Sequence, residues 1–219
     1  MSAYRQKAEQ FVARLNADAE DTLPGEVRIA FGIAEGFAAK FAQIKADNRF
    51  SSQGHSSEIK KALAAGPLDH LKQIHRGVDR RLGNLRSELA SFQPKLPDRS
   101  DTFGELQRRE LREFLRNQKE GERRRLALED PAFREAVAHA PAALSGLSQS
   151  TKDEVVAAIV EATHGARAEF NRRGISMLEE ARTALSEAIA DIRRQSGLSE
   201  REFSDVGVID WRAEGPANV

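Results

Sequence analysis

Residues 68–92 read LDHLKQIHRGVDRRLGNLRSELASF and carry the strongest periodic pattern in the chain. Eight residues occupy successive a and d positions of a seven-residue repeat, and seven of the eight are apolar. They are Leu68, Leu71, His75, Val78, Leu82, Leu85, Leu89 and Phe92. The repeat predicts a long amphipathic helix with Leu71, Val78, Leu82 and Leu85 as its main buried residues. In a parallel homodimer Arg81 would face Arg86 of the other helix, so we expect antiparallel packing, within the chain or between chains.

The remaining sequence predicts further helices on both sides of this stretch. Ala, Arg, Glu, Leu and Lys make up about half of the 219 residues, a composition typical of long helices. A Ser or Thr precedes a Glu by three residues, the spacing of a helix capping box, at Thr102/Glu105, Thr151/Glu154, Ser176/Glu179 and Ser199/Glu202. We therefore expect an all-α fold, an irregular multi-helix bundle with long amphipathic helices and a non-helical C-terminal tail.

A helix-breaking segment in the middle of the sequence predicts two helical units. The segment QPKLPDRSD, residues 93–101, has the composition of a linker. It predicts an N-terminal unit at 1–92, a linker at 93–102 and a C-terminal helical unit at 103–197. From Phe203 onward the sequence FSDVGVIDWRAEGPANV has no helical period, so we expect an extended tail at 198–219.

Two features of the second unit need the structure to decide them. The helix that follows Thr102 is expected to place its apolar residues on the core side, namely Phe103, Leu106, Leu111, Phe114 and Leu115. Farther along, Arg172, Arg173 and Gly174 form a typical helix C-terminus, so a hairpin or kink at Gly174 is slightly favoured over one continuous helix.

The sequence contains no motif that indicates catalysis or cofactor binding. It has no phosphate-binding glycine loop, no dinucleotide fingerprint, no nucleophile elbow and no zinc-protease motif. The chain has no Cys, and His70 and His75 are five residues apart, which places them on different faces of a helix. We therefore expect a protein that is not an enzyme, with no catalytic residues, no cofactor and no metal.

Charge is distributed unevenly although the 34 basic and 34 acidic side chains cancel. Residues 108–125 contain eight basic and four acidic side chains, whereas residues 198–219 contain two basic and five acidic ones. A solvated helix face with local Glu–Arg pairs is the simplest interpretation of the basic segment. The functional interpretation is an acidic protein surface bound by Arg116, Arg123, Arg124 and Arg125. Nucleic acid bound by residues 108–125 is the alternative, weakened because residues 116–125 lack the aromatic side chains on which bases stack.

Trp211, the only tryptophan, lies in the predicted tail beside Val206, Val208 and Ile209. These side chains need an apolar surface, either on their own bundle or on a neighbouring subunit. We expect Trp211 to bind a partner, through self-association or in a larger assembly. We expect no membrane partner, because the most apolar stretch, residues 27–44, is short and contains Glu35 and Lys40.

The segment 129–148, EDPAFREAVAHAPAALSGLS, resembles stretches of small helical structural proteins encoded by tailed phages and prophages. The resemblance is carried by Asp130, Pro131, Ala140, Pro141, Leu144, Ser145, Gly146 and Leu147. It implies a non-enzymatic structural or interaction protein, such as a head-to-tail or capsid-associated virion component. Such a protein would be cytoplasmic during assembly and part of the virion afterwards.

Overall fold

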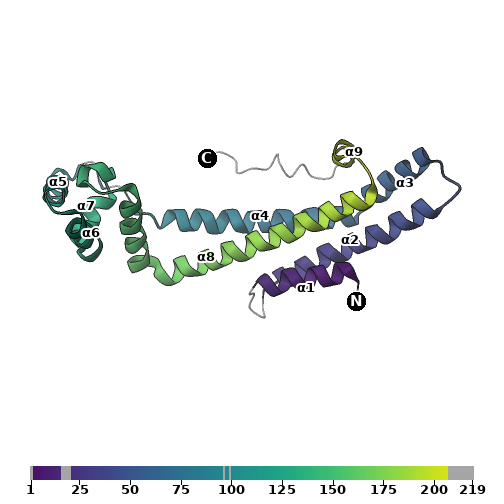
Figure 1. Cartoon of the computed structure of the whole chain (residues 1–219), viewed down its shortest axis with the longest axis horizontal. Coiled ribbons are helices and arrows are strands. Elements are labelled where there is room, and N and C mark those ends of the chain that lie inside the picture. The colour runs from purple at the N-terminus through teal and green to yellow at the C-terminus, as the bar shows by residue number, and fades with distance from the viewer. Residues whose placement is uncertain (1, 16–20, 96, 99, 207–219) are drawn as a thin grey trace. The chain divides into compact units, whose positions relative to one another are not determined.

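The computed structural model describes residues 2–15, 21–95, 97–98 and 100–206. Within these ranges the regular structure consists of nine α-helices and one short 3-10 helix (Figure 1). In chain order they are α1 (Ala3–Leu15), α2 (Leu23–Ala46), α3 (Ser52–Ala64), α4 (Pro67–Ser91), α5 (Thr102–Arg116), α6 (Glu120–Glu129), α7 (Pro131–Ala138), η1 (Ala142–Ser145), α8 (Gln149–Ser196) and α9 (Glu200–Asp205). The all-α class expected from the sequence is confirmed. The predicted extended tail at 198–219 is wrong at its start, where residues 200–205 form α9, and its remainder from residue 207, with Trp211, lies outside the described residues.

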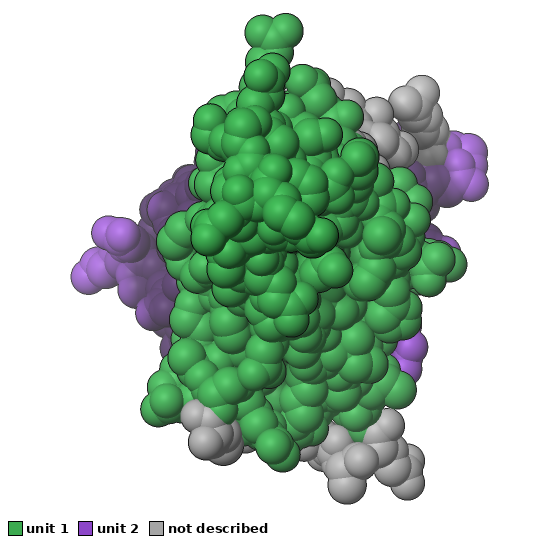
Figure 2. Space-filling model, turned by 90° about the vertical axis from the view of Figure 1, so that its right-hand side faces the viewer, with its two compact units in different colours: residues 1–84, 174–219 green, residues 85–173 purple. Residues whose placement is uncertain are grey.

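The chain forms two compact units, which Figure 2 colours separately. Unit 1 comprises residues 1–84 and 174–219, and unit 2 comprises residues 85–173. This division differs from the predicted one, because residues 93–102 fall inside unit 2 and the predicted unit 103–197 is divided. The cause lies in α8, whose C-terminal part contributes the buried Leu185 and Ile192 to unit 1.

The core of unit 1 is built from large apolar residues of several helices. In α1 and α2 the rings of Phe11 and Phe31 stack with centroids 5.7 Å apart. Lys7 of α1 binds Asp191 of α8, with Nζ 2.7 Å from Oδ2. The most deeply buried large side chains of this unit are Leu15, Val27, Phe31, Phe41, Leu63, Leu71, Val78, Leu185 and Ile192.

Helix α4 follows the predicted seven-residue repeat over most of its length. Leu68, Leu71, His75, Val78 and Leu82 are buried. The predicted burial of Leu85 is wrong in degree, since this side chain and those of Leu89 and Phe92 are only half-buried.

Within unit 2 the end of α4 runs antiparallel to α8, as the sequence predicted. Glu88 Oε1 accepts a hydrogen bond of 2.7 Å from Arg167 Nε. Just past the end of α4, the ring of Phe92 stacks on that of His164, with centroids 4.5 Å apart. Residue numbers therefore rise in α4 while they fall in α8, which is the signature of antiparallel helices.

Helix α8 continues through Gly174 and bends instead at His164. The backbone of His164 has φ −133° and ψ 15°, outside the helical region. The predicted break at Gly174 is therefore wrong, and the pair Ser176/Glu179 lies inside the helix rather than at a helix start. The residues on both sides of Gly174 have helical backbone geometry.

Three other capping predictions have different outcomes. The box at Ser199/Glu202 is confirmed at the start of α9. Helix α8 begins earlier than predicted, because Ser148 Oγ rather than Thr151 accepts a backbone hydrogen bond, 3.1 Å from Thr151 N. Helix α5 is capped by Asp101, one residue before the predicted Thr102.

Candidate protein interface

Helix α5 in unit 2 is held at its N-terminus by a tight cap. Asp101 Oδ1 accepts a hydrogen bond of 2.9 Å from the amide nitrogen of Gly104. A Cβ at residue 104 would lie 2.1 Å from Asp101 Oδ2, so a larger residue there would force the capping carboxylate to move. The cap fixes the direction in which α5 leaves the preceding loop.

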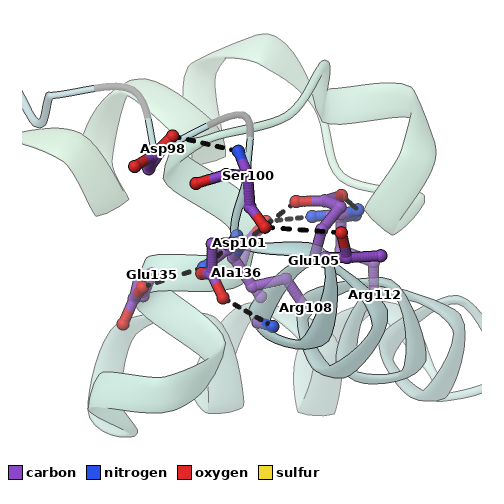
Figure 3. Close-up of polar contacts among 10 residues, drawn as sticks. Asp98, Ser100, Asp101, Glu105, Arg108, Arg112, Glu135 and Ala136 are labelled. Atoms are coloured by element: carbon purple, nitrogen blue, oxygen red, sulfur yellow. Dashed lines mark hydrogen bonds and ion pairs between the residues drawn. The ribbon is translucent and has the colours of Figure 1, made fainter.

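The inner side of α5 carries an arginine where an amphipathic helix usually places an apolar residue. Arg108 is only 7 % exposed, and its guanidinium reaches Glu105, Asp101 and Glu135 at 3.1, 3.2 and 3.5 Å (Figure 3). Glu135 belongs to α7, so Arg108 joins two helices of unit 2. Hydrogen bonds to Glu105, and then to Asp101, raise the pKa of Arg108, so the guanidinium stays charged.

Arg112 lies one turn farther along the same inner side and is 6 % exposed. Its Nη1 donates to the carbonyl oxygen of Ala136 in α7 at 3.1 Å, and its Nη2 lies 2.5 Å from Glu105 Oε1 (Figure 3). Hydrogen bonds from Arg112 and then from Arg108 lower the pKa of Glu105 below its ordinary value of 4.5. The two arginines and Glu105 therefore fix the rotation of α5 about its own axis.

Because the arginines occupy the inner side, the apolar residues of α5 face outward. Phe103, Leu106 and Phe114 are 73 %, 53 % and 50 % exposed. The prediction that they lie on the core side is wrong, and among its five residues only Leu115 is fully buried, while Leu111 is half-buried. We define the α5 outer face as Phe103, Leu106, Gln107, Glu110, Leu111 and Phe114.

A groove lies beside the C-terminal part of this face, between α5 and α7. Its walls are formed by Gln107, Glu110, Leu111, Phe114, Ala132 and Phe133. The rings of Phe114 and Phe133 are in contact, with centroids 5.7 Å apart at an interplanar angle of 33°. The α5 outer face therefore combines protruding apolar side chains with an apolar hollow.

Behind α5, the core of unit 2 is small and apolar. Leu115, Ala127, Val137 and Val155 are buried there and come from four different helices. Leu126, Leu128, Phe133, Leu147 and Ile159 are partly buried against them. Leu115 thus anchors the C-terminal end of α5, while the arginines hold its middle.

Three of the four arginines predicted as partner contacts, namely Arg123, Arg124 and Arg125, have intramolecular side-chain contacts. Arg123 donates to the carbonyl oxygens of Leu115, Arg116, Gln118 and Gly146, which ties the end of α5 to η1. Gly146 has φ +67°, a left-handed conformation that favours glycine. The side chains of Arg116 and Arg123 both lie close to its Cα.

The other two predicted arginines point elsewhere on α6. Arg124 Nη2 lies 2.8 Å from Glu154 of α8, and Arg125 pairs with Glu122 and Glu129 on its own helix. These carboxylates raise the pKa of Arg125, Glu122 first. Arg116 is exposed. The local Glu–Arg pairs expected for a solvated helix face are present at Arg125, whereas the partner of Arg124 lies 30 residues away in the sequence.

We expect the attachment of α5 to weaken in acid. A carboxyl whose folded pKa is lowered stabilises the fold above its unfolded pKa and loses that effect as the pH falls through the folded pKa. For Glu105 this window lies below pH 4.5. Hydrogen exchange of the α5 amides should therefore accelerate as the pH falls from 4.5, after correction for the intrinsic rate.

Glu105→Gln and Glu110→Gln provide the matched comparison for this pH dependence. The first variant removes the titrating partner of Arg112 and should flatten the acid dependence of α5, while the second alters an outer-face carboxyl and should leave it unchanged. The same acid slope in both variants would contradict the role of Glu105.

Comparison with known proteins identified no matching family model, no matching curated protein and no matching solved structure. In the described part of the chain, no helix is both long and apolar enough to cross a membrane. Over the same residues, the His, Asp and Glu side chains do not form a group that could hold a metal ion.

Proposed function

We propose that this chain is a non-catalytic interaction protein that binds another protein through the α5 outer face. The observation that carries the proposal is the exposure of Phe103, Leu106 and Phe114 together on one side of one helix. Contiguous apolar patches of this kind are uncommon on monomeric proteins and mark interaction sites. Aromatic side chains in particular supply much of the binding energy at protein interfaces.

The rigidity of α5 supports the same proposal. Arg108 and Arg112 hold the helix on α7, so the outer face is presented in one orientation before a partner arrives. A preorganised surface binds more tightly than a mobile one, because less conformational entropy is lost on association. Because these contacts hold the apolar side of α5 away from the core of unit 2, that side is suited to binding a partner.

The charges of residues 108–125 give less support to the nucleic-acid alternative. Arg108, Arg112, Arg124 and Arg125 each have carboxylate partners, and Arg123 binds backbone carbonyls. Phosphate binding requires basic groups that can replace bound counterions. Arg116 and Trp211 stay predicted partner contacts, and the resemblance of residues 129–148 to tailed-phage structural proteins supports a place in a larger assembly.

Photocrosslinking in the cells that produce the chain tests this proposal. A photoreactive benzoylphenylalanine replaces Phe103, Phe114 or, as a matched control, Phe170, a 59 % exposed phenylalanine of α8 that is stacked with Arg167. We expect protein adducts of higher mass from positions 103 and 114 and few from position 170, because only the first two lie on the α5 outer face.

Each other outcome contradicts the proposal. Adducts that a nuclease removes would favour the nucleic-acid alternative. Equal yields at all three positions would mean that the α5 outer face is not a preferred contact, and no adducts at any position would remove the case for a protein partner.

A further inference from the structure

The residues of the α5 outer face follow the same order when read from either end. From residue 103 they are Phe103, Leu106, Gln107, Glu110, Leu111 and Phe114. Counted inward from the two ends, Phe103 matches Phe114, Leu106 matches Leu111, and Gln107 matches Glu110. A surface with this mirrored order is complementary to itself when a second helix lies against it in the opposite direction.

We propose that the α5 outer face binds the same face of a second copy of this chain, with the two α5 helices antiparallel about a two-fold axis at the middle of α5. This inference rests on the proposed function and names its partner. A two-fold interface uses one patch on both subunits, so every contact occurs twice. Phe103 of each copy then lies against Phe114 of the other, and Leu106 against Leu111.

The protruding ring and the groove lie at opposite ends of the face, as this arrangement requires. Phe103 is the most exposed large apolar side chain of the described residues. The groove is lined on α5 from Gln107 to Phe114, and Phe114 at its far end lies eleven residues beyond Phe103, about 16 Å at 1.5 Å per residue. Antiparallel pairing places the Phe103 ring of each copy at the groove of the other, so both grooves are filled at once.

The polar pair at the centre fixes the register. In the proposed pairing the amide of Gln107 faces the carboxylate of Glu110 in the second copy, and its N–H groups can donate to that carboxylate. Moving the two-fold axis to residue 110 would bring the two Glu110 carboxylates together, which is a repulsive contact. It would also shift Phe103 of each copy past Phe114 of the other copy, so the two rings would no longer face each other. The side chains therefore favour one alignment over its neighbours.

The size of the patch predicts a reversible dimer. A fully buried aromatic residue contributes about 150–250 Å² of surface, so two Phe and two Leu per copy reach at most the lower end of the roughly 1,200–2,000 Å² found in stable interfaces. Dissociation constants on the order of 1–100 µM are typical of such contacts, so the monomer should dominate in dilute solution.

Sedimentation equilibrium of the purified full chain tests the association. We expect a monomer–dimer equilibrium between 1 and 500 µM, roughly the range set by the expected dissociation constants. Phe103→Glu should weaken the dimer at least roughly tenfold, because it removes an apolar anchor that the monomer already exposes. Phe170→Glu, at an exposed phenylalanine away from α5, should leave the equilibrium unchanged.

Disulfide trapping tests the orientation, since the chain contains no cysteine of its own. A mixture of the variants Phe103→Cys and Phe114→Cys should form a linked heterodimer, whereas each variant alone should link slowly. Rapid linking of Phe103→Cys to itself would show a parallel pair and overturn the proposed orientation.

The two experiments separate this inference from the proposed function. A chain that stays monomeric at 500 µM while position 103 still forms protein adducts in cells has a different partner, and the second-copy inference fails alone. A dimer that resists Phe103→Glu uses another surface and also overturns the inference. Monomer in solution together with no adducts in cells overturns both.

Discussion

Replacing Leu82 with alanine is expected to lower the free energy of unfolding by about 2–5 kcal/mol, the usual cost of truncating a well-packed leucine. Leu82 is 3 % exposed and lies on the same buried side of α4 as Val78, which is fully buried. The truncation leaves a space that rigid neighbouring helices fill only in part. Urea unfolding followed by circular dichroism measures the change.

The matched control for Leu82→Ala is Ile29→Ala, which truncates a 44 % exposed side chain of α2 in the same unit. Surface substitutions away from special contacts usually change stability by less than about 0.5 kcal/mol. An equal loss of unfolding free energy in the two variants would show that the buried side of α4 is not packed as described.

Removing the Arg123 side chain is expected to destabilise unit 2 by about 1–3 kcal/mol, because partly buried carbonyl oxygens lose their donor. The guanidinium donates hydrogen bonds to four carbonyl oxygens where α5, α6 and η1 meet. A lysine at this position could not reproduce the planar set of donors, so Arg123→Lys should recover little. Thermal unfolding and hydrogen exchange of residues 115–147 measure the loss.

Arg124→Ala is the control for this substitution, since Arg124 is adjacent in sequence and its side chain is 57 % exposed in a surface ion pair. Exposed pairs contribute about 0–1 kcal/mol. If Arg124→Ala costs as much as Arg123→Ala, the backbone contacts of Arg123 are not the cause. A loss of partner binding in Arg124→Ala without a loss of stability would instead support the sequence-based partner role.

The all-α class and the course of α4 could be predicted from the sequence because both depend on local patterns. The seven-residue repeat marks the buried side of α4 from Leu68 to Leu82. The pair Ser199/Glu202 marks the start of α9 because both side chains bond to the backbone of their own first turn. Neither feature requires knowledge of distant residues.

The bend of α8 could not be located in this way. Gly174 follows two arginines and has the local pattern of a helix end, yet it lies inside a helix whose buried side runs on to Leu178. His164, where the backbone does depart from helical geometry, stacks on Phe92, which is more than 70 residues away in sequence. The bend thus coincides with a tertiary contact that the local sequence does not reveal.

The candidate interface was missed for a related reason. The apolar residues of α5 form a clear stripe, and a stripe normally faces the core. The spacing of Glu105 from Arg108 and Arg112 gave a signal, since three and seven residues place all three on one side of the helix. The sequence did not reveal the further acceptors on α7, Glu135 and the Ala136 carbonyl, that let this charged side be the buried one.

The two inner arginines also decide between two possible states of the same helix. Turned by nearly half a revolution, α5 would shelter its phenylalanines, but it would then expose Arg108 and Arg112 to water and break their bonds to α7. The charged contacts thus favour the orientation in which the apolar side chains of α5 face outward. Replacing both arginines with leucine would remove these contacts, so the buried charges on the inner side of α5 set which of its two sides is available to a partner.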